Sequence, residues 1–85
     1  MKTYSYLSEM QQFCFRATQA FIVLEDKGMQ DFYSAAEKGF DAECNSLTCE
    51  NASAGINQSQ IENYFRLKDF VESKEREAAE KIRTA

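Results

Sequence analysis

Apolar residues recur at intervals of three and four along three stretches of the chain, within residues 7–24, 29–47 and 61–71. This spacing is that of amphipathic α-helices, whose apolar side chains line up on one face. Proline is absent and there are three glycines, so few residues interrupt the stretches. We therefore predict an all-α fold without a sheet, a single helical domain with helices at about residues 5–26, 29–53 and 57–83.

Glycines suggest where the first two helices end. Gly28 follows Lys27 and Gly55 precedes Ile56, so each glycine is expected to close a helix in the left-handed conformation. Asn45-Ser46 is a possible break in the second helix, but we expect that helix to continue to residue 53. Gly39 lies inside the same helix, where it costs about 1 kcal/mol relative to alanine or marks a close helix crossing.

The third helix has the clearest start signal. Asn57 is a good N-cap residue, and Gln60 three positions later completes the pattern of a capping box. After Val71 the apolar face thins, and residues 72–85 are expected to form a charged, solvated helical extension. Charged residues four apart predict ion pairs along this helix: Glu62–Arg66, Glu72–Arg76 and Glu77–Lys81.

Hydrophobicity also predicts self-association. Residues 13–24 are apolar around most of the helix circumference, and the chain has seven phenylalanines and four tyrosines. A helix of this kind is either central in the fold or covered by another subunit. We expect a small three-helix bundle or helical hairpin with an extended charged C-terminal helix, which forms a two-fold homodimer. The interface residues that we predict are Phe15, Ile22, Phe65 and Phe70.

Composition argues against catalysis and against metal or cofactor binding. The chain has no histidine, three cysteines and only isolated glycines, so neither a nucleophile–base pair nor a phosphate loop can be recognised. Cys14 falls on the apolar stripe, where burial should make its thiol slow to react. The first residues lack the apolar core of a signal peptide, and no segment is long enough to span a membrane. We therefore expect a cytoplasmic, non-enzymatic protein.

Negative charge is concentrated in the middle of the chain. The net charge is −4, and residues 24–50 carry seven acidic side chains and two lysines, which is a net charge of −5. This argues against direct nucleic-acid binding, which requires clustered Lys and Arg, and predicts a protein partner with a basic surface. Tyr33 is expected to act there as an exposed anchor. The alternative is that the charge only keeps the protein soluble. The predicted partner-binding residues are Asp31, Tyr33, Glu37, Asp41 and Glu43.

A short segment resembles a known family. Residues 32–37, Phe-Tyr-Ser-Ala-Ala-Glu, followed by Ala42-Glu43, resemble part of the Hha/YmoA family of small helical regulators, which dock on a nucleoid-associated DNA-binding protein. The resemblance covers about eight positions, and no binding residue is transferred from it. We predict an accessory factor that binds protein, such as a phage- or mobile-element-encoded inhibitor of a host complex. The alternatives are a transcriptional co-regulator that docks on a DNA-binding protein and an acidic DNA mimic.

Overall fold

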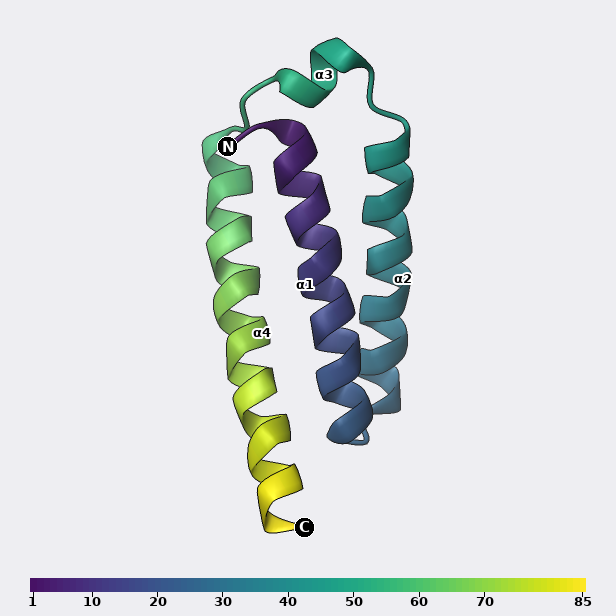
Figure 1. Ribbon diagram of the computed structural model, residues 1–85, viewed down its shortest axis with the longest axis vertical. Helices are drawn as coiled ribbons and strands as arrows, with labels where there is room; N and C mark the ends of the chain where they lie inside the picture. The colour runs from purple at the N-terminus through teal and green to yellow at the C-terminus, as the bar shows by residue number, and fades with distance from the viewer.

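The computed structural model describes all 85 residues, and it is entirely helical apart from turns. The three long helices are α1 (Thr3–Val23), α2 (Lys27–Asn45) and α4 (Gln58–Thr84), and the short helix α3 (Cys49–Ser53) links α2 to α4. Figure 1 shows α1 between α2 and α4, with α3 across the end of the molecule near the N-terminus. The molecule measures 49 × 21 × 16 Å. The predicted all-α class is confirmed.

Helix α1 provides most of the core. It contributes nine of the eleven buried residues, whereas α2 contributes none and α4 contributes Val71 and Ala78. Helices α2 and α4 both pack against α1, and their backbones hardly approach each other. The central position of α1 explains within one chain why residues 13–24 are apolar around most of the helix.

Three aromatic rings, one from each long helix, join the bundle. Tyr33 of α2 stacks on Phe21 of α1 and on Phe70 of α4, with 5.8 Å between ring centroids in both pairs. The rings of Phe21 and Phe70 are 6.1 Å apart. The ammonium group of Lys74 lies 5.6 Å from the ring centroid of Phe70. We call Phe21, Tyr33 and Phe70 the aromatic triad.

The turn between α1 and α2 differs from the prediction. Helix α1 ends at Val23, and the left-handed residue is Glu25, with φ 59°; no glycine has a positive φ. Gly28 therefore lies inside α2 and does not close α1. Asp26 caps α2 by accepting a hydrogen bond from the Met29 N–H at 3.2 Å. The carboxylate of Glu25 also pairs with Lys81 of α4 at 3.1 Å, so a tertiary contact helps to hold the turn.

The prediction that the second helix continues to residue 53 is also wrong. Helix α2 ends at Asn45, where the Ser46 hydroxyl donates to the carbonyl of Glu43 at 2.9 Å. Thr48 then starts α3 by accepting a hydrogen bond from the Asn51 N–H at 3.1 Å. Hydroxyl side chains of this kind compete with helical bonding and favour caps. Gly55 forms an isolated antiparallel bridge with Lys2, and so it does not act as a left-handed cap.

Helix α4 begins as predicted but pairs its charges differently. The Asn57 side chain accepts a hydrogen bond from the Gln60 N–H at 2.8 Å, and the Gln60 side chain accepts one from the Asn57 N–H at 2.9 Å. The predicted pairs Glu62–Arg66, Glu72–Arg76 and Glu77–Lys81 do not form. Glu77 pairs with Lys74 at 2.9 Å, and Lys81 pairs with Glu25.

Candidate protein-binding groove

A groove of about 500 Å³ runs between α2 and α4, with α1 as its floor. It exists because both outer helices lean on α1 and leave one side of the bundle open. The aromatic triad closes one end, since Tyr33 and Phe70 reach across α1 there. We call it the α2–α4 groove. Its floor is formed by Tyr6, Met10 and Cys14, and its walls by Phe32, Tyr33, Ala36 and Phe40 of α2 and Asn63, Arg66, Leu67 and Phe70 of α4.

Phe32 is the exposed aromatic residue of the groove. Its side chain is 62% exposed, and its ring stands edge-on against Tyr33 with 5.0 Å between centroids. Tyr33, which we predicted to be the exposed anchor, is instead half-buried in the aromatic triad, and burial raises the pKa of its hydroxyl. Phe32, and not Tyr33, is therefore the exposed aromatic residue at this place on α2.

Arg66 is the cation of the groove wall. It is exposed and forms no ion pair within the chain, because Glu62 does not reach it. At the groove end nearer the N-terminus of α1, burial raises the pKa of the Tyr6 hydroxyl. Asn63 and Glu43 are close enough to influence this pKa, the first lowering it by a hydrogen bond and the second raising it by its charge.

Cys14 lies at the floor of the groove and is only 1% exposed. Burial raises the pKa of its thiol to about 11, and the negative charge of Glu37 adds to this shift. A thiol in this state is a poor nucleophile. The predicted burial of Cys14 is confirmed, while Cys44 is half-buried and Cys49 is exposed.

The predicted acidic residues do not form one continuous patch. Asp31 pairs with Lys27 at 2.6 Å, and Asp41 accepts a hydrogen bond from the Gln11 side chain at 3.4 Å. Glu37 lies one turn before Asp41 and therefore shares its side of α2, toward α1. Glu43 acts on Tyr6 at the groove end. The carboxylates of α2 are thus spread around the helix.

Three of the four predicted interface residues are exposed. Phe15 and Ile22 are 50% and 46% exposed and lie seven residues apart, so they share one face of α1. Phe65 is 54% exposed, but it lies beside Met1 at the end of the molecule that carries the N-terminus. Phe70 is not free for an interface of this kind, because it is half-buried in the aromatic triad.

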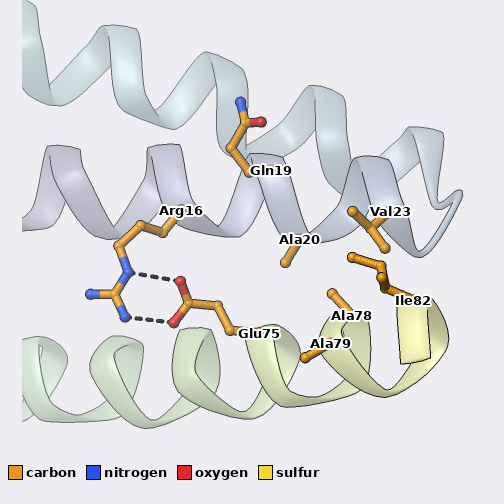
Figure 2. Close-up of a pocket in the computed structure, with 8 residues that line it drawn as sticks. All are labelled: Arg16, Gln19, Ala20, Val23, Glu75, Ala78, Ala79 and Ile82. Atoms are coloured by element: carbon orange, nitrogen blue, oxygen red, sulfur yellow. Dashed lines mark hydrogen bonds and ion pairs between the residues drawn. The ribbon is translucent and has the colours of Figure 1, made fainter.

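A second hollow, of about 410 Å³, lies between α1 and the C-terminal half of α4. Figure 2 shows the Arg16–Glu75 ion pair at one end of it and Ile82 at the other. Arg16 donates two hydrogen bonds, 2.9 and 2.5 Å long, and they lower the pKa of the Glu75 carboxyl. Because its two charges neutralise each other, this hollow offers a ligand less than the α2–α4 groove does. Its lining is completed by Gln19, Ala20, Val23, Ala78 and Ala79.

No group of three or more His, Cys, Asp or Glu side chains is arranged to hold a metal ion. None of the helices has the length and hydrophobicity that a bilayer span requires. Comparison with protein-family models, with curated proteins and with solved structures finds no match.

Proposed function

We propose that the protein is a non-enzymatic accessory factor that acts by binding another protein through the α2–α4 groove. The observation that supports this most is the exposed Phe32 on the rim of an open, apolar groove. Exposed apolar surface on a small protein commonly marks an interaction site, and buried aromatic anchors supply much of the binding free energy of interfaces.

The state of the ionisable groups in the groove favours binding over chemistry. Burial raises the pKa of the Cys14 thiol and of the Tyr6 and Tyr33 hydroxyls, which moves all three further from pH 7. Nucleophiles and bases of active sites are instead tuned toward the working pH. An inhibitor or adaptor of another protein is the function that fits such a groove.

The acidic side chains of α2 have a supporting role in this proposal. Glu37, Asp41 and Glu43 form no ion pairs, and their negative charge would steer encounter with a basic partner surface. Because these carboxylates are spread around the helix, a protein partner is favoured over DNA mimicry. A co-regulator that docks on a DNA-binding protein is compatible with the same groove. Reversing the three charges should slow association and remove its salt dependence.

The experiment that tests the groove is affinity capture from cells that encode the protein, with matched variants. Phe32→Ala should lose the partner captured by the wild type. Tyr4→Ala should keep it, because Tyr4 is similarly exposed, at 56%, but lies outside the groove. Circular dichroism should show equal helix content in both variants. Capture that is unchanged by Phe32→Ala would contradict the proposal.

A homodimer through the outer face of α1 is a second proposal. It is supported by Phe15 and Ile22, which expose apolar side chains on the same face of the central helix. Sedimentation at tens of micromolar, a range usual for such assays, should show a dimer for the wild type and a monomer for the Phe15→Gln/Ile22→Gln double variant. A monomeric wild type at this concentration would disprove self-association by this face.

A further inference from the structure

We infer that the group bound in the α2–α4 groove is an amphipathic α-helix of the partner, with a carboxylate that pairs with Arg66. The inference rests on the proposed function and specifies its ligand. Three observations support it independently: the open side of the helical bundle, the empty space beside Gly39, and the unpaired guanidinium on the groove wall.

The first observation is the shape of the groove. Its floor is one helix and its walls are two others, so a fourth helix laid over Met10 and Cys14 would contact all three. Helices pack at about 8–10 Å by inserting side chains into such grooves. Helix-in-groove binding is also a recurrent mode of peptide recognition.

The second observation is the free space along α2. Phe32, Ala36 and Gly39 are four and three residues apart, so they lie on one side of the helix, and the first two line the groove. A Cβ atom added at Gly39 would have no atom within 4 Å apart from its chain neighbours and the backbone of its own helix. A glycine inside a helix is unfavourable unless another helix crosses closely beside it. No helix of this chain crosses closely at Gly39. A partner helix would fill this space, and small residues allow its backbone to approach.

The third observation is the charge of the wall. Arg66 forms no ion pair in a chain that carries a net charge of −4. A carboxylate is the most favourable partner for a guanidinium group, because two parallel hydrogen bonds can form. The other candidate is a fatty acid, which also combines a carboxylate with an apolar chain. Sites for small ligands enclose most of the ligand, whereas this groove leaves Phe32 62% exposed, and so a helix is favoured.

Two synthetic helical peptides test the inference. Both carry leucines at positions i, i+3, i+4 and i+7, and one has a single glutamate where the other has a lysine. Binding is measured by the fluorescence of a tryptophan in the peptide, since the protein has none. The glutamate peptide should bind the wild type about two- to five-fold more tightly than the lysine peptide, a range expected of a solvent-exposed ion pair.

Charge exchange provides the control. Arg66→Glu should reverse the preference and bind the lysine peptide more tightly, a gain that an unfolded variant could not show. Arg76→Glu should leave the preference unchanged, because Arg76 is also exposed and unpaired on α4 but lies outside the groove. Phe32→Ala should weaken both peptides at least about five-fold, as expected for an interface anchor, and Tyr4→Ala should not.

Several results would overturn the inference. The first is that neither peptide binds saturably. The second is that adding a peptide shifts amide NMR signals on the Phe15–Ile22 face and not in the groove. The third is that laurate binds saturably in the groove while the peptides do not. Shifts of groove residues on dilution of the protein alone would identify a second copy as the ligand. If capture of the natural partner still depends on Phe32 while the peptides fail, only the helical ligand is wrong. If capture does not depend on Phe32, the proposed function fails instead.

Discussion

Tyr33 provides the sharpest test of how the bundle is held together. In the structure its ring stacks on Phe21 and on Phe70, with 5.8 Å between centroids in each case. An aromatic pair contributes about 0.5–1.5 kcal/mol beyond its area burial. Tyr33→Leu keeps an apolar side chain but loses both stacked pairs. We therefore expect the free energy of unfolding to fall by about 1–3 kcal/mol, and Tm by about 4–24 °C for a domain of this size.

Urea denaturation followed by circular dichroism measures this change. Tyr4→Leu is the matched control, because Tyr4 is 56% exposed and forms no aromatic pair, so the loss of its ring should change the free energy of unfolding by no more than about 0.5 kcal/mol. Phe70→Leu, alone and combined with Tyr33→Leu, completes a double-mutant cycle, whose coupling energy should be about 0.5–1.5 kcal/mol. If Tyr33→Leu is as harmless as Tyr4→Leu, Tyr33 is a surface residue and the aromatic triad does not join the helices.

Three further predictions concern local features. With a thiol pKa of about 11, Cys14 should react with a thiol reagent at pH 8 far more slowly than the exposed Cys49, and equal rates under native conditions would show that α1 is misplaced. The Arg16 hydrogen bonds lower the pKa of Glu75, so their stabilisation should be present above about pH 4.3 and be lost as the pH falls through the lowered pKa. Both side chains are more than a third exposed, so Glu75→Gln should remove under about 1 kcal/mol at pH 7 and progressively less as the pH is lowered, and a loss that does not change with pH would disprove the ion pair. Asn57→Ala should lower the free energy of unfolding in urea by about 1 kcal/mol through loss of the capping box, while a change below about 0.3 kcal/mol would mean that the cap is dispensable.

Features carried by residues close together in the chain could be predicted from the sequence. The apolar spacing of α1 located its helix and the burial of Cys14, and the spacing of Asn57 and Gln60 located the start of α4. These features depend on contacts within one or two helical turns. They therefore leave a local pattern that the sequence displays directly.

Features decided by distant segments could not be predicted in this way. Phe32 and Tyr33 occupy the same part of the apolar stripe of α2, and Phe21 and Phe70, which lie on other helices, select which ring is buried. The turn after α1 places Glu25 in the left-handed region and pairs it with Lys81, although Gly28 is the more obvious candidate for this conformation. The groove itself arises from the packing of α2 and α4 on α1, which no local pattern describes.

The uneven share of the core has a consequence for how the protein can evolve. Helix α2 contributes no fully buried residue, and on its groove side only Tyr33 and Phe40 pack against the core. Changes at Ala36, Gly39 or Phe32 could alter which sequences are recognised at little cost in folding stability. Substitutions in α1 are more restricted, because nine of its residues are buried in the core. In related sequences, α1 should therefore change slowly, whereas groove residues of α2 should change together with the partner's binding surface.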